Sequence, residues 1–90
     1  MAYKQLVKSK EILVRYLEYV EFDFDSIEYL LDSIDYMLQK KIPCNPTILN
    51  ILIEDILIAG TYHKSKDLLD VASLLKDLCE ELEKCTISQS

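Results

Sequence analysis

Apolar residues recur every three or four positions in four separate segments of the chain, which is the spacing of one face of an α-helix. The first segment shows the pattern at Leu6, Leu13, Leu17 and Val20. The second shows it at Ile27, Leu30, Leu31, Ile34 and Leu38, and the third at Leu49, Leu52, Ile53 and Ile56. The fourth sustains it through Leu68, Val71, Leu75, Leu78, Leu82 and Cys85. The pattern predicts four amphipathic helices.

Residues that start and stop helices separate these segments. Asp25 suits an N-cap, and Glu28 three residues later completes the pattern of a capping box. Asn45 followed by Pro46 is typical of an N-cap and a first helical position. Gly60 is a natural C-terminal stop. These signals place the helix boundaries at both ends of the third segment and at the start of the second.

The expected fold is all-α, a compact bundle of four helices. The helices should span about residues 2–20, 26–40, 46–59 and 65–84. Short connections favour antiparallel neighbours in a bundle over an orthogonal array. A chain of 90 residues is expected to form one domain, with residues 1–85 in the helical domain and residues 86–90 as a flexible C-terminal tail.

The composition is acidic, with a formal net charge of −6 from 16 Asp and Glu against 10 Lys and Arg. This balance disfavours nonspecific binding to nucleic acid and to anionic membranes. No apolar run approaches the roughly 20 residues of a membrane span, and the N-terminus lacks a signal-peptide pattern. We therefore expect a soluble cytoplasmic protein. Abundant Ile and a strong excess of Lys over Arg are typical of AT-rich genomes, so phage or viral origin, with a host-cytoplasmic location, is one interpretation.

Residues that could carry chemistry are few. The three cysteines, Cys44, Cys79 and Cys85, are odd in number and have no CxxC spacing, which indicates reduced thiols rather than a disulfide framework. The only histidine, His63, lies in a predicted loop away from any cysteine in the sequence. A single glycine excludes a Gly-rich phosphate loop. We therefore expect no catalytic residue, no metal and no cofactor, and interpret the protein as a non-enzyme.

The second predicted helix carries a stripe of carboxylates bordered by tyrosines. The predicted partner-binding residues are Asp25, Glu28, Tyr29, Asp32, Asp35 and Tyr36. The carboxylates are spaced three, four and three apart, so they share one side of the helix. Tyrosine is enriched at interfaces because one end is apolar and the other polar. The stripe therefore indicates either a surface for a basic partner or an ordinary solvated face.

The third predicted helix is apolar on nearly all sides. Ile51 and Ile58 point away from its core face and lie near Glu54 and Asp55. Four helices of this length can hardly surround one of their own, so the surplus face needs another cover. A homodimer through Ile51 and Ile58 is the favoured explanation, and cover by a chain terminus is the alternative.

Three functional hypotheses follow. The first is a protein-protein interaction module, such as an adaptor or inhibitor, that binds a basic protein surface. The second is a nucleic-acid mimic, whose carboxylates occupy Arg and Lys clusters that normally bind phosphates. The third and weakest is a helical dimer that binds nucleic acid through the net-basic first helix, with Lys4, Lys8, Lys10 and Arg15. Lys10 lies inside the apolar arc of that helix, where it either reaches water or pairs with a carboxylate.

Overall fold

The computed structural model describes residues 3–20 and 24–89, without the side chains of residues 24 and 85–89. The helices are α1 (Lys4–Leu17), α2 (Phe24–Leu38), α3 (Pro46–Tyr62) and α4 (Lys66–Gln89). The described residues contain no strand. The predicted all-α fold with four helices is therefore confirmed.

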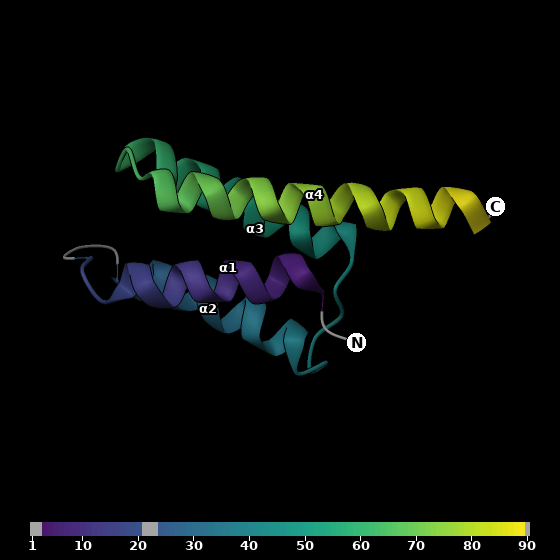
Figure 1. The fold of residues 1–90 in the computed structure, drawn as a ribbon, viewed down its shortest axis with the longest axis horizontal. Coiled ribbons are helices and arrows are strands. Elements are labelled where there is room, and N and C mark those ends of the chain that lie inside the picture. The colour runs from purple at the N-terminus through teal and green to yellow at the C-terminus, as the bar shows by residue number, and fades with distance from the viewer. Residues whose placement is uncertain (1–2, 21–23, 90) are drawn as a thin grey trace.

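The four helices form two layers (Figure 1). Helices α1 and α4 pack against each other and lie nearer the viewer, while α2 packs on α1 and α3 packs on α4 from behind. The molecule measures 46 × 25 × 17 Å, and the C-terminal end of α4 extends beyond the other helices. The main packing contacts thus join α2 to α1 and α3 to α4, rather than α2 to α3.

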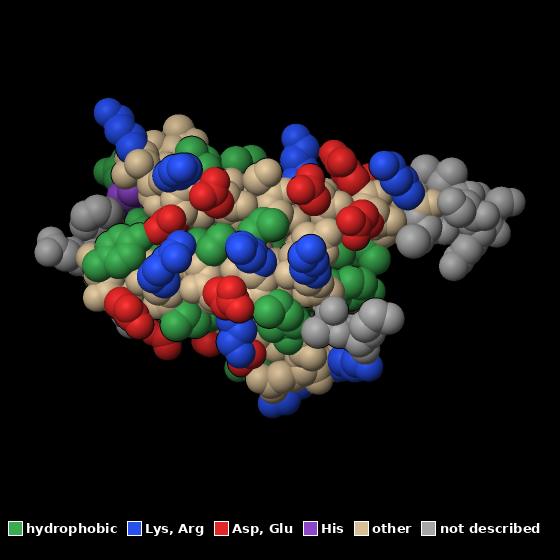
Figure 2. All heavy atoms as spheres, in the orientation of Figure 1, with side chains coloured by type: hydrophobic (Ala, Val, Ile, Leu, Met, Phe, Trp, Pro, Cys, Tyr) green, Lys and Arg blue, Asp and Glu red, His purple; other side chains and the backbone are tan. Residues whose placement is uncertain are grey.

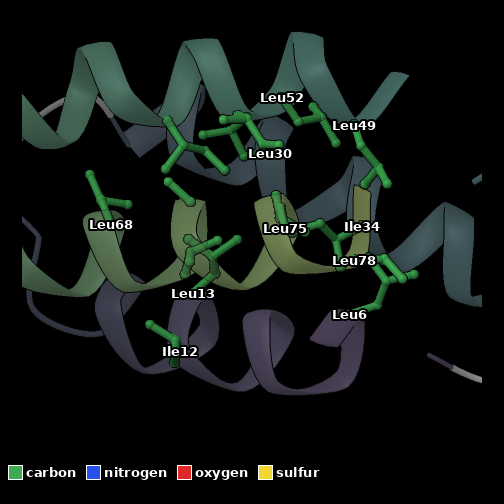
Figure 3. Packing of buried hydrophobic residues seen from close by; sticks show 14 of the residues in the cluster. Leu6, Ile12, Leu13, Leu30, Ile34, Leu49, Leu52, Leu68, Leu75 and Leu78 are labelled. Carbon is green, nitrogen blue, oxygen red and sulfur yellow. The ribbon is translucent and has the colours of Figure 1, made fainter. Parts of the chain in front are cut away.

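Each helix contributes its predicted apolar face to one shared core (Figure 3). Leu13, Ile34, Ile56 and Leu75, one from each helix, are completely buried. Burying a side chain of this size contributes about 1.5–3 kcal/mol. The core is therefore what holds the two layers together.

Side-chain caps form at the starts of α3 and α4, whereas the predicted Asp25 cap of α2 does not form. The Asn45 side chain accepts a hydrogen bond from the Ile48 backbone N–H at 2.9 Å, as expected for an N-cap before Pro46. The Ser65 hydroxyl accepts one from the Leu68 N–H at 3.3 Å at the start of α4. Asp25, in contrast, lies in the first turn of α2 rather than before it. A carboxylate there still interacts favourably with the positive end of the helix dipole.

Gly60 does not end the third helix as predicted, because α3 continues to Tyr62. A Cβ at Gly60 would lie 3.2 Å from the Leu68 Cβ, so the glycine permits α3 and α4 to approach closely. The residue that leaves the helix in the left-handed conformation is Lys64, with φ 53°. The Ser65 N–H donates to the Gly60 carbonyl at 2.9 Å, which closes a Schellman motif.

The other helix ends also differ from their predicted bounds. Helix α1 stops at Leu17, and the Glu18 and Tyr19 N–H groups bond back only three residues in a tight last turn. Helix α2 ends at Leu38, with Lys40 in the left-handed conformation. Helix α4 continues through residues 86–89, where a tail was predicted, and residue 90 lies outside the described residues. None of the described helices is long and apolar enough to span a membrane.

Candidate functional site: the α2/α3 face

The two helical layers differ in the signs of the charges they carry. Helices α2 and α3 carry only acidic charges, at Asp25, Glu28, Asp32, Asp35, Glu54 and Asp55, and contain no Lys or Arg. Helices α1 and α4 carry both signs, and Figure 2 shows Lys and Arg interspersed with Asp and Glu on their side of the molecule. The two layers therefore present electrostatically different surfaces.

Large exposed apolar side chains gather on the same two acidic helices. In the described part of the chain, five such side chains are more than half exposed, at Tyr19, Tyr29, Ile51, Ile58 and Tyr62. Only Tyr19 lies outside α2 and α3, and its hydroxyl donates a hydrogen bond to the Asp67 carboxylate. We call the exposed residues of α2 and α3 the α2/α3 face, defined as Asp25, Glu28, Tyr29, Asp32, Ile51, Glu54, Asp55, Ile58 and Tyr62.

A groove of about 600 Å³ crosses this face between the two helices. Its lining residues are Asp25, Ser26, Tyr29 and Leu30 from α2, and Asp55, Ile58, Ala59, Tyr62 and His63 from α3 and its C-cap. Leu30 is buried and Ala59 half-buried, so they form the floor, whereas Tyr29 and Tyr62 are exposed at the edges. The groove exists because α2 and α3 pack on different partners and because Ser26 and Ala59 have small side chains.

The predicted partner-binding residues do not all belong to this groove. Asp25 and Tyr29 line it, while Glu28 and Asp32 are exposed but do not line it. Asp35 is instead engaged with α1, because its carboxylate lies 2.8 Å from the Lys10 Nζ and also accepts from the Gln39 side chain at 2.8 Å. Lys10 was expected either to reach water or to pair with a carboxylate, and in the structure it pairs with Asp35.

Tyr36, the last predicted partner-binding residue, lies two turns along α2 from Tyr29. Its ring accepts a cation–π contact from Lys41, whose Nζ lies 5.7 Å from the ring centroid. The side chain is 44% exposed. Tyr36 therefore belongs to the far end of α2 and not to the groove.

The two residues predicted for a dimer interface are both exposed, Ile51 by 54% and Ile58 by 64%. Ile58 lines the groove beside Tyr29, and Ile51 lies two turns earlier on the same side of α3. The partner surface and the dimer surface, which sequence reasoning treated separately, thus meet on one face. Tyr62 was missed, although its spacing of four from Ile58 places it on the same stripe once α3 continues past Gly60.

The carboxylates of the α2/α3 face form no ion pair with any side chain that the structure describes. Within the described residues, ion pairs form at Lys10–Asp35 and, at 3.9 Å, Arg15–Asp67. None of Asp25, Glu28, Asp32, Glu54 and Asp55 takes part in one. Two of the basic residues considered for nucleic-acid binding, Lys10 and Arg15, are in contrast already paired. The unpaired charges on α2 and α3 are therefore all negative, whereas those on α1 and α4 have both signs.

The groups that could support catalysis or metal binding are dispersed. Burial raises the pKa of the Cys44 and Cys79 thiols, and nearby Glu83 adds to the effect at Cys79. A raised pKa is the opposite of what an activated thiolate requires. His63 lies edge-on to Tyr62, with ring centroids 4.8 Å apart. Across the described residues, no group of three or more His, Cys, Asp or Glu side chains is placed to hold a metal ion. The Cys85 side chain lies outside this description.

Comparisons of the chain with protein-family models, with curated proteins and with solved structures find no match. The case for a function therefore rests on the geometry and charge of the α2/α3 face.

Proposed function

We propose that this protein is a non-enzymatic interaction module that binds a basic surface of another protein through the α2/α3 face. The observation that supports the proposal most is the coincidence of two features on one face. Four large apolar side chains are more than half exposed there, and every charged residue within α2 and α3 is acidic. Exposed apolar patches rimmed by charge are typical of protein interaction sites.

The two features have separate energetic roles in such a complex. Burying Tyr29, Ile58 and Tyr62 removes large apolar surfaces from water, at about 25 cal/mol per Å² of apolar area. The unpaired carboxylates attract a basic partner and exclude acidic ones, which sets specificity and association rate more than affinity. An apolar centre with a charged rim is the usual anatomy of a specific interface.

A paired set of variants tests the proposal. The face variant Tyr29→Lys/Ile58→Lys reverses the character of the α2/α3 face at two exposed positions. The control variant Val7→Lys/Val14→Lys makes the same change at two exposed positions of α1. Partners captured by the wild-type protein from its native host should be lost with the face variant and retained with the control. Equal capture by all three helical proteins would refute the proposal.

Nucleic-acid mimicry is the second candidate, supported by the absence of Lys and Arg from α2 and α3. Because Asp35 is paired with Lys10, the mimicking stripe would consist of Asp25, Glu28 and Asp32. Salt separates the candidates, since a mimic should lose affinity steeply as salt rises. Neutralising these three carboxylates should abolish binding by a mimic, whereas an apolar interface should be weakened more by changing Tyr29 and Ile58.

A homodimer through Ile51 and Ile58 would occupy the same face and would compete with a partner. A two-fold arrangement would place the unpaired Glu54 and Asp55 of both copies near one another, which opposes association. Sedimentation of the wild-type protein decides between the two uses. A dimer that Ile51→Glu/Ile58→Glu converts to a helical monomer would assign this surface to self-association.

A further inference from the structure

We infer that the groove between α2 and α3 receives one amphipathic helix of another protein, with apolar residues on its inner side and Lys or Arg along its edges. The inference rests on the proposed function and specifies the chemistry of the partner segment. Its starting point is a groove with an apolar floor, Leu30 and Ala59, and a carboxylate on each wall, Asp25 and Asp55.

The dimensions of the groove suit about two turns of helix. On the α3 side, its lining runs from Asp55 to His63. At about 1.5 Å per residue, this stretch is roughly 12 Å long. A docked helix would present apolar anchors at positions i, i+3 or i+4, and i+7 over that length, which is the usual pattern of helix-in-groove recognition. Tyr29 and Ile58 stand on opposite walls, where they would contact the sides of the anchors.

The charges specify the edges of the occupant. Asp25 and Asp55 line opposite walls, and neither forms an ion pair in the described part of the chain. Glu28, Asp32 and Glu54 are exposed on the same two helices but do not line the groove. Of the nine lining residues, His63 alone can carry positive charge. A helix with Lys or Arg on both sides of its apolar stripe would therefore face carboxylates along both walls.

A second copy of this chain fits the groove less well. Placing two grooves face to face would bring Asp25 and Asp55 of both copies together. The net-basic helix α1 buries its apolar face in the core, and its exposed Val7 and Val14 each have a glutamate four residues further on. Charge complementarity therefore favours a segment of a different protein.

Selection from a displayed library of random peptides, each about 16 residues or roughly four helical turns long, tests the inference. The full-length protein is the bait. Selected peptides should share apolar residues at helical spacing flanked by Lys or Arg, and should gain helical circular dichroism on binding. Selection of acidic peptides, of peptides without helical spacing, or of none at all would overturn the inference.

Two uncharged variants locate the binding site on the groove. Ala59→Phe fills the floor, and Ile58→Ser removes part of a wall at a position that is 64% exposed. Each should weaken a selected peptide by about tenfold or more, because each removes the burial of at least one apolar anchor. The control Leu57→Ser alters the neighbouring exposed residue, which does not line the groove, and should change the affinity by less than about twofold. If Ala59→Phe does not fold, Ile58→Ser decides.

The outcomes distinguish this inference from the proposed function. If the native partner is lost with Tyr29→Lys/Ile58→Lys but retained with both Ala59→Phe and Ile58→Ser, the groove is not the binding site while the α2/α3 face remains one. If the face variant also retains the partner, both proposals fail. A wild-type dimer that dissociates with Ile58→Ser and not with Leu57→Ser would assign the groove to a second copy and overturn the inference.

Discussion

The two buried serines, Ser9 and Ser33, differ in whether the hydroxyl has a hydrogen-bond partner, and this difference should be measurable as a difference in stability. Ser9 on α1 is completely buried, and its hydroxyl has no hydrogen-bond partner among the described residues. Ser33 on α2 is 9% exposed, and its hydroxyl donates to the Tyr29 carbonyl at 2.9 Å. Replacing each with alanine removes the same group from two similar helical positions, one unpaired and one paired.

The expected change in the free energy of unfolding follows from the hydrogen bonds to water that a serine hydroxyl loses when it is buried. A buried hydroxyl without a partner costs about 1–3 kcal/mol, whereas a satisfied hydrogen bond contributes about 0.5–1.5 kcal/mol net. Alanine is also a better helix former than serine by about 0.5 kcal/mol, and this gain is common to both sites. Ser9→Ala should therefore stabilise the protein by about 1–2 kcal/mol after the small cavity is subtracted. Ser33→Ala should lie between no change and about 1 kcal/mol of destabilisation.

Urea denaturation followed by far-ultraviolet circular dichroism measures both values. The midpoint for Ser9→Ala should rise with an unchanged slope, since the surface exposed on unfolding is the same. The melting temperature should rise by about 4–8 °C for each kcal/mol in a domain of this size. If Ser9→Ala is destabilised as much as Ser33→Ala, the Ser9 hydroxyl has a partner and the reasoning from its burial is wrong.

Three further substitutions test the core, the ion pair and the helix cap by the same denaturation measurement. Leu13→Ala should destabilise by about 2–5 kcal/mol, because Leu13 is completely buried and its removal leaves a cavity; a loss below about 1 kcal/mol would contradict its place in the core. Lys10→Met should change stability by less than about 1 kcal/mol, because the Lys10–Asp35 pair remains partly exposed to water; a larger loss would show that the pair is screened from solvent. Asn45→Ala should cost about 0.5–2 kcal/mol through loss of the cap on the Ile48 N–H, and Asn45→Asp should retain most of it.

The periodic apolar positions predicted the core because burial is a property of one helix face at a time. Leu13, Ile34, Ile56 and Leu75 were identified by spacing alone and are completely buried in the structure. Helix number and approximate bounds followed for the same reason. The arrangement in two layers was not predictable in this way, because periodicity contains no information on which helices are neighbours.

The helix ends were less predictable, because tertiary contacts changed the role of the signal residues. Gly60 carries the usual mark of a helix stop, yet it serves the close approach of Leu68 across the α3–α4 interface. Lysines at positions 40 and 64 adopt the left-handed conformation that glycine or asparagine more often occupies. Local propensity was therefore overruled where two helices pack closely and where a Schellman turn forms without glycine.

Individual residues of the candidate site could be predicted from the sequence, but their arrangement around one groove could not. Tyr29 and Ile58 were each identified as surplus to a plain fold, but 29 residues separate them and no local pattern indicates that they share a groove. Asp35 illustrates the opposite case, since its position in a regular stripe concealed its pairing with Lys10 on another helix. Contacts between distant segments thus bring Tyr29 and Ile58 together in one groove. They also exclude Asp35 from the candidate site, because Asp35 pairs with Lys10.

The acidic side chains of this fold differ in whether they have a structural role. The fold itself uses Asp35 and Asp67 in ion pairs, and Asp25 lies where it complements the dipole of α2. Glu28, Asp32, Glu54 and Asp55 form no ion pair in the described residues, and like charges on one face oppose compaction through mutual repulsion. If the proposed function holds, the carboxylates of α2 and α3 and the exposed Tyr29, Ile58 and Tyr62 would act together on a basic partner, the carboxylates by attraction and the apolar side chains by burial.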